Sequence, residues 1–444
     1  LAVHVAAAFF GGDQASASKT YGGFTALVYM TGILGGYVAD RILGYQRSIM
    51  LGGALMAVGS FMLMAPDLTT FVIGLAVIVV GNGLFKPNIS TMVGKLYAPG
   101  DSRRDSGFTI FYMGINAGAF IAPIICSIYV GATYGTRYGF MAAGIGMILA
   151  VVVFHLRKDI LGHVGKPEPR HAGFMPIINV TIGVIAVTAV SYFLLSKSDI
   201  LGQILLALFG GLAIYLIRSG FSESKEQGQK YIAMFILFTA NILFWALFEQ
   251  AGASLNFLAK DFISAPFHFS LFQSANPLFI ILLAPVFALL WPKLETMNMN
   301  PSIPRKFAIA LVGMAAGFAI IVFAIKNIGD ATKIHWLWLA GLYLVHTMAE
   351  LCLSPIGLSM VTKLAAPKNV GLSMGGWFLA TAVANYLAGR ISAIASGGGG
   401  HSEAASGLTQ YSTTFTWLIY AGLIVGAIYW IFGGMINKLM HGVR

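Results

Sequence analysis

Long apolar runs alternate with short polar or glycine-rich segments along nearly the whole chain. A helix that spans a bilayer needs about 20 mainly apolar residues, and thirteen runs reach or approach that length. They lie near residues 20–39, 48–64, 71–95, 107–130, 138–156, 174–195, 201–217, 231–259, 271–290, 307–325, 336–364, 372–394 and 411–436. This pattern predicts an all-α membrane protein.

The runs divide into two sets of six around a central pair, if the short run at residues 1–10 is counted as the tail of a truncated helix. No basic segment precedes that run, so it does not read as a signal peptide. The central pair has no internal charge and lies between charged linkers, so we expect it to face lipid. We predict an N-terminal six-helix bundle at 1–157 with its first helix truncated, linkers with two extra transmembrane helices at 158–230, and a C-terminal six-helix bundle at 231–444.

Composition supports the membrane assignment. The chain is 57% hydrophobic and only 10% charged, its mean hydropathy is +0.80, and soluble domains carry about 25% charged residues. The 53 glycines suit close packing of helices in lipid. Cys126 and Cys352 lie in apolar runs, so we expect buried packing residues rather than a disulfide.

The net charge of +11 is a topology signal rather than a sign of nucleic-acid binding. Most of the Lys and Arg residues fall in every second loop, and the positive-inside rule places those loops in the cytoplasm. We therefore expect a multi-pass protein of the inner (plasma) membrane with a cytoplasmic C-terminus and the lipid bilayer as its surroundings.

Three charges lie deep inside predicted spans, far from either end: Lys86, Glu249 and Glu350. A charge at the centre of a bilayer helix costs about 2.5–3.5 kcal/mol on insertion scales, so such residues usually have a function. Glu249 recurs at helical spacing with Trp245 and Asn256, which predicts one polar face. All three charges would then meet in a water-filled cavity.

Lys86 directly precedes Pro87, and Glu350 shortly precedes Pro355 at the matching position of the other half. Proline should kink both helices near their charge, and interrupted helices at matching positions indicate a binding site at the membrane midplane. Two alternatives remain at this stage, namely ordinary transmembrane kinks and a fixed structural ion pair.

The segment GGYVADRILG at 35–44 lies at the first cytoplasmic turn between spans. Its glycines allow tight packing, and Asp40 and Arg41 could change partners when two bundles move, which would make it a gating loop. It resembles the loop signature of the major facilitator superfamily. The alternative is a solvated turn with charges at its ends.

Three further stretches narrow the resemblance: FKPNIS at 85–90, FYMGINAG at 111–118 and FWALFEQ at 244–250. With the loop at 35–44, they resemble the proton-coupled oligopeptide transporter family over nearly the whole chain. The central helix pair matches the extra pair of that family's bacterial members. The resemblance implies the major facilitator fold and import of di- and tripeptides with protons by alternating access. It implies no cofactor, no metal and no enzymatic activity, and we expect a monomer.

The resemblance also implies roles for individual residues. Lys86 matches a cavity lysine that faces the peptide carboxylate. Glu350 matches an acid that pairs with this lysine and receives the peptide amino group. Glu249 matches a residue that carries the proton. The other matching positions contact the peptide or lie beside the acids: Tyr29, Asn116, Trp245, Asn276, Ser354 and Trp377.

The sequence departs from the family in two places. The acidic-plus-arginine motif E-x-x-E-R of the first helix does not occur and would lie just before Leu1, and Tyr21 is followed by Gly22 where some members have histidine. We expect that the chain is trimmed or disordered at that point, so the arginine partner that the resemblance implies for Glu249 is unassigned.

Rival functions remain open. A facilitator of another small solute such as nitrate, an amino acid, a sugar or a drug is one, although a site with a cation and two carboxylates suits a zwitterion better than a neutral sugar. An intramembrane enzyme would need a nucleophile with a base or a metal cluster, and a channel would need a filter repeat. The spans contain no such pattern, and His335 and His346 lack metal-ligand spacing.

Overall fold

The computed structural model describes residues 1–97, 101, 103–166, 175–328, 333–396 and 404–443, which are largely helical. The chain forms two compact units, one of residues Gly23–Leu201 and one of Leu1–Gly22 with Gly202–Arg444. These borders differ from the predicted bundle borders at 157/158 and 230/231, and the bundle assignment stays a prediction. α2 (Gln14–Val38) contributes its first residues to one unit and the rest to the other.

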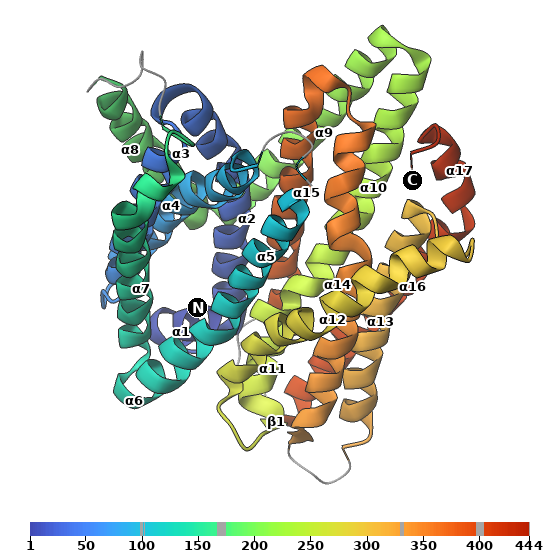
Figure 1. Ribbon diagram of the computed structural model, residues 1–444. Helices are drawn as coiled ribbons and strands as arrows, with labels where there is room; N and C mark the ends of the chain where they lie inside the picture. Colours follow the sequence, from blue (N-terminus) through green and yellow to red (C-terminus); the bar gives the residue numbers. More distant parts are fainter. Residues whose placement is uncertain (98–100, 102, 167–174, 329–332, 397–403, 444) are drawn as a thin grey trace. The chain divides into compact units, whose positions relative to one another are not determined.

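Among the described residues, the first unit holds most of α2 and six complete α-helices. They are α3 (Tyr45–Met62), α4 (Leu68–Lys95), α5 (Arg103–Ala122), α6 (Ala132–Tyr134), α7 (Thr136–Arg157) and α8 (Met175–Ser196). α3 and α4 lie side by side (Figure 1) because glycines face each other along their contact. A Cβ atom on Gly52 would lie 2.6 Å from the Gly81 carbonyl oxygen, and one on Gly59 would lie 2.7 Å from that of Gly74. This is the close backbone approach that small residues permit in lipid.

The second unit holds the start of α2 and most of the C-terminal half. Its other helices are α1 (Ala2–Phe9), α9 (Ser198–Glu223), α10 (Lys225–Phe248), α11 (Ser254–Phe262), α12 (Ala275–Thr296), α13 (Ile303–Lys326), α14 (Trp336–Leu364), α15 (Val370–Ala395), α16 (Ala404–Ile431) and α17 (Gly433–Leu439). α13 packs against α14 and α16, and all three lie together in Figure 1. Phe318 and Phe415 fill the contact with ring centroids 5.1 Å apart. Two short strands, β1 (Ile263–Ser264) and β2 (Ile334–His335), pair in parallel at a loop edge.

Twelve helices among the described residues are long and apolar enough to cross a membrane. They coincide with twelve of the thirteen predicted spans. The remaining one, α3, is a helix of 18 residues whose first turn contains Gln46 and Arg47, which lower its hydropathy. The windows in α8 and α9 are each 22% buried, more than the spans at Gly107–Tyr134 (6%) and Thr136–Leu161 (11%), so burial does not single out the central pair and its lipid-facing position stays a prediction. Cys126 and Cys352 are both free thiols.

The start of α2 is fixed to α15 by close backbone contact. A Cβ atom on Gly22 would lie 2.7 Å from Gly389 Cα, and the hydroxyls of Ser18 and Ser392 lie 2.9 Å apart in a hydrogen bond. Neither serine is exposed. This segment of α2 is therefore part of the core of the second unit.

Candidate transport site

An acid cluster in the second unit centres on Glu350 of α14, which is 7% exposed. Asn276, in the first turn of α12, donates from Nδ2 to Glu350 Oε2 at 2.7 Å and to Thr347 Oγ1 at 3.1 Å. The Thr347 hydroxyl donates to the Tyr343 carbonyl at 2.7 Å. Because the first turn of a helix is the positive end of its dipole, α12 also favours the carboxylate. The structure thus brings Asn276 and Glu350 together, as the predicted site requires.

The second acid, Glu249, lies where its helix breaks. α10 ends at Phe248, Glu249–Gly252 forms a 3₁₀ turn, and α11 starts at Ser254. The continuous polar face predicted from Trp245 through Glu249 to Asn256 is therefore wrong. A Cβ atom on Gly252 would collide with the Tyr21 hydroxyl, so the chain passes that ring only with glycine at the break.

The break is stabilised by the buried side chain of Gln250. Its Nε2 donates to the carbonyls of Ala246 at 2.9 Å and Ala388 at 3.1 Å, and its Oε1 accepts from the Ser254 hydroxyl at 2.6 Å. Irregular backbone at membrane depth persists only where other groups satisfy it. Gln250 does so here, and Glu249 is held half-buried at the turn.

A polar network extends from the helix break toward Glu350. The Ala251 carbonyl accepts from Gln273 Nε2 at 2.8 Å and, at the long distance of 3.5 Å, from the Tyr343 hydroxyl. Gln273 also donates to Asn256 Oδ1 at 3.3 Å. Glu249 and Glu350 are close enough for their charges to interact. Sequence reasoning missed Thr347, Tyr343 and Gln273, although the helical spacing of Thr347 from Glu350 was a usable signal.

The predicted side-chain contacts occupy different surroundings. Trp377 is 4% exposed and packs against Phe238 and Phe307, with ring centroids 5.7 and 6.5 Å away. Trp245 packs edge-on against its own helix neighbour Phe248, with centroids 5.2 Å apart. Ser354 is half-buried one turn after Glu350. Their contacts with a peptide stay predictions, and in this structure the Trp377 ring belongs to the packing of its unit.

Lys86 lies in the first unit on α4, which continues as a helix through Pro87. It is exposed, and its Nζ lies 4.5 Å from the centroid of the Tyr29 ring, a cation–π contact. The buried Asn88 donates to the carbonyls of Gly35 at 3.0 Å and Leu84 at 2.7 Å, which ties α4 to α2. The structure brings Tyr29 and Lys86 together, whereas the pairing of Lys86 with Glu350 stays a prediction.

Asn116 is 6% exposed on α5, and its Nδ2 donates to the Tyr112 carbonyl at 3.0 Å. Its predicted contact with a peptide is untested.

The predicted gating loop folds into a π-helical turn at Ala39–Leu43, where Asp40 and Arg41 are both exposed. The Tyr45 hydroxyl donates to the Asp40 carboxylate, and Lys95 Nζ lies 4.2 Å from the Tyr45 ring centroid. Gly44 closes the turn at φ 75°, a backbone conformation that favours glycine. The movement of this loop stays a prediction.

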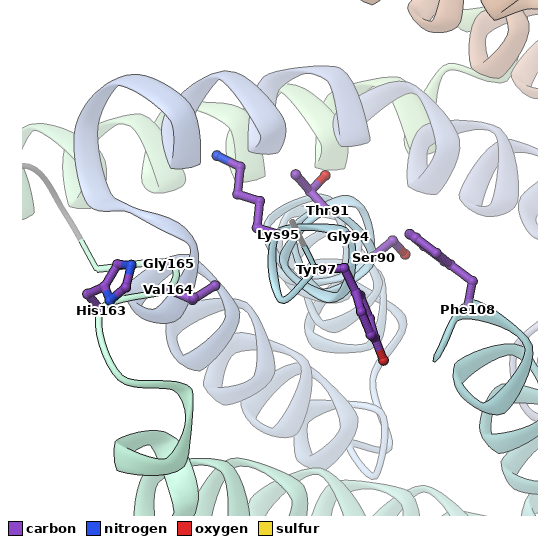
Figure 2. A pocket seen from close by; sticks show the side chains of 9 residues that line it. All are labelled: Ser90, Thr91, Gly94, Lys95, Tyr97, Phe108, His163, Val164 and Gly165. Atoms are coloured by element: carbon purple, nitrogen blue, oxygen red, sulfur yellow. The ribbon is translucent and has the colours of Figure 1, made fainter. Parts of the chain in front are cut away.

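A hollow of about 870 Å³ lies at the end of α4 (Figure 2). Its wall combines the last turns of α4, Phe108 of α5 and residues 163–165 after α7. Gln46 fixes that last segment, because its backbone N–H and its Nε2 donate to the Gly165 and Val164 carbonyls at 2.9 and 2.7 Å.

In the described part of the chain no group of three or more His, Cys, Asp or Glu residues could hold a metal.

In the described part of the chain, twelve membrane-length helices and the acid cluster buried among them define an all-α membrane transporter of the major facilitator type. A model of the POT family matches residues 46–404 of the chain. The chain therefore belongs to the POT family, whose members are transporters rather than enzymes.

Individual relatives agree with that family. The peptide transporter YePEPT of Yersinia enterocolitica is 35% identical over 100% of this chain and 91% of its own. The di-/tripeptide transporter of Lactococcus lactis is 36% identical over 95% of this chain and 86% of its own. The crystal structure of a mutant peptide transporter POT in complex with alafosfalin superposes with a TM-score of 0.84 at 34% identity, covering 100% of this chain and 90% of that one. A POT family transporter in complex with 5-aminolevulinic acid gives a TM-score of 0.82 at 30% identity, covering 98% and 92%.

Proposed function

We propose that this protein is a proton-coupled symporter that imports di- and tripeptides by alternating access. The observation that carries the proposal is the buried Glu350, held by Asn276, in a chain of the POT family. Relatives named for di- and tripeptides support the substrate class.

The proposed substrate chemistry follows from the two ends of a peptide. Lys86 would bind the carboxylate, and Glu350 with the Asn276 amide oxygen would receive the ammonium group. Both amide hydrogens of Asn276 already go to Thr347 and Glu350, so its oxygen is the atom that remains to accept a bond. In the empty state Lys86 would pair with Glu350, and the two ends of a peptide would compete for these partners. Tyr29, Asn116, Trp245, Ser354 and Trp377 would complete the peptide contacts.

Proton coupling would use Glu249, with Glu350 and Lys86 responding to its charge. A proton that moves inward down 100 mV supplies about 2.3 kcal/mol, and one pH unit supplies about 1.4 kcal/mol. Because each 1.4 kcal/mol is a factor of ten, one proton per zwitterionic peptide supports accumulation of about 500-fold. No cofactor beyond the coupling proton is needed.

The remaining parts of the proposal concern topology. The protein would be a monomer in the inner membrane. Its C-terminus would be cytoplasmic, because it belongs to the basic set of segments, which the positive-inside rule assigns to the cytoplasm. Two bundles at 1–157 and 231–444 would rock about the site, and the extra helices within 158–230 would lie outside them. Asp40 and Arg41 would change partners during this movement.

The test uses purified protein in liposomes with an inside-alkaline, inside-negative gradient. Dialanine should accumulate, and an uncoupler should abolish the accumulation. Glu249→Gln should abolish gradient-driven accumulation and retain exchange of peptide, whereas Glu295→Gln, at an exposed carboxylate bonded to Asn300, should leave both intact. Accumulation of nitrate or a drug without dialanine would instead support another facilitator, and driven uptake by Glu249→Gln would remove that residue as the proton carrier.

A further inference from the structure

We propose that Thr347 is a positioning residue for peptide recognition, which orients the Asn276 amide so that its N–H groups face Glu350 and its oxygen faces the peptide amino end. The inference rests on the proposed function, because it concerns recognition at the same site. It begins from the fact that Thr347, which is not exposed, bonds with both Asn276 and its own helix backbone.

The orientation of the amide follows from the hydroxyl of Thr347. A threonine hydroxyl has one hydrogen and two acceptor lone pairs. That hydrogen is committed to the Tyr343 carbonyl at 2.7 Å, the usual backbone bond of a helical threonine. The oxygen therefore presents only lone pairs to α12, and they accept an N–H but repel the Asn276 oxygen.

The orientation of the Asn276 amide decides which of its atoms face Glu350 and which face the ligand. With Nδ2 between Thr347 and Glu350, the carboxylate accepts a hydrogen bond at 2.7 Å. If the amide turned over, its oxygen would face the carboxylate, and two acceptors would oppose each other in a buried site. The amide oxygen would then also be lost as an acceptor for an ammonium group. A methyl group in place of the hydroxyl would remove the selection without changing the size of the side chain.

Thr381 offers a matched control within the same unit. It is also buried, its hydroxyl donates to the carbonyl one turn back at Trp377 (3.1 Å), and its oxygen accepts from Asn241 Nδ2 at 3.4 Å. Thr381 therefore has the same local pattern without a carboxylate beyond the asparagine. Replacing either threonine by valine should cost similar stability, but only position 347 should change ligand recognition.

The experiment compares Thr347→Val, Thr347→Ser and Thr381→Val in proteoliposomes. Thr347→Val should raise KM for dialanine by about 2- to 10-fold, the value of one hydrogen bond. Inhibition of the remaining uptake by millimolar N-acetyl-dialanine, which has no ammonium group, should be unchanged. Thr347→Ser should stay within about twofold of the parent, because one hydrogen bond is retained, and Thr381→Val should have parental KM. Thr347→Ala provides the same comparison if the valine variant does not fold.

A double-mutant cycle completes the test. If Thr347 acts through Asn276, Thr347→Val should not raise KM further in an Asn276→Ala background. Additive effects, an unchanged KM in Thr347→Val, or an equal loss of affinity for dialanine and its N-acetyl derivative would overturn the proposal. Failure of the parent protein to transport any dialanine would instead refute the proposed function, so the two failures are distinguishable.

Discussion

Gly22→Ala should separate the start of α2 from α15. The added methyl would lie 2.7 Å from Gly389 Cα and 2.9 Å from both the Gly389 nitrogen and the Asn385 carbonyl oxygen. All three are backbone atoms of α15, so no side-chain rotation can relieve the clash. The segment must move away, and the 2.9 Å hydrogen bond between Ser18 and Ser392 would be lost with it.

The size of the effect follows from the cost of overpacking. Inserting a methyl into a well-packed contact typically costs about 1–3 kcal/mol, which changes the ratio of docked to undocked segment by about 5- to 150-fold. Gly23→Ala is the control because its methyl would meet only the Leu201 and Leu195 side chains, at 3.6 and 3.8 Å. Both substitutions gain similar helix propensity, so the difference between them isolates the contact.

The assay is the labelling rate of a cysteine at position 18 in purified protein, with Cys126 and Cys352 replaced by alanine. Ser18 is not exposed, so a hydrophilic maleimide reacts only when the segment undocks. Gly22→Ala should accelerate labelling of the cysteine at position 18 by about 5- to 150-fold, the change in the ratio of docked to undocked segment. Gly23→Ala should leave the labelling rate unchanged. Equal rates in both variants, with equal amounts of folded protein, would refute the reasoning.

Two further substitutions test packing and capping. Gly317→Ala would put a methyl against the His346 ring and strain the 3.0 Å hydrogen bond between this ring and the Met314 carbonyl. The variant should therefore lose about 1–3 kcal/mol of stability in detergent unfolding. Gly341→Ala is the control, because its methyl meets one atom at 3.9 Å and should cost no stability, and equal losses in the two variants would contradict this account. At the start of α2, the Ser16 hydroxyl donates to the Asp13 carboxylate at 2.6 Å and lowers the pKa of Asp13. Because the folded pKa lies below the unfolded value of roughly 3.9, this carboxylate stabilises the fold at neutral pH, and the gain is lost below that value as pH falls through the lower folded pKa. Asp13→Asn should therefore weaken the decline of the unfolding temperature between pH 6 and pH 3, and an unchanged slope would argue against the cap.

Much of the architecture was predictable from sequence for one physical reason. An apolar run of about 20 residues has few stable options other than a spanning helix, since lipid satisfies no backbone polar group. The predicted spans therefore match helices of the structure. The same logic identified Lys86, Glu249 and Glu350, because a charge in such a run is costly wherever the run packs.

Only the tertiary structure decided the arrangement around those charges. The break at Glu249 is stabilised by Gln250, which donates to the Ala388 carbonyl of α15, and Tyr21 of α2 approaches Gly252 beside it; helical spacing along α10 carries no trace of either contact. The burial of Trp377 similarly depends on Phe238 and Phe307 of neighbouring helices. Periodicity within one segment reports which side chains share a face, whereas the neighbours that break, bury or orient them come from segments distant in the chain.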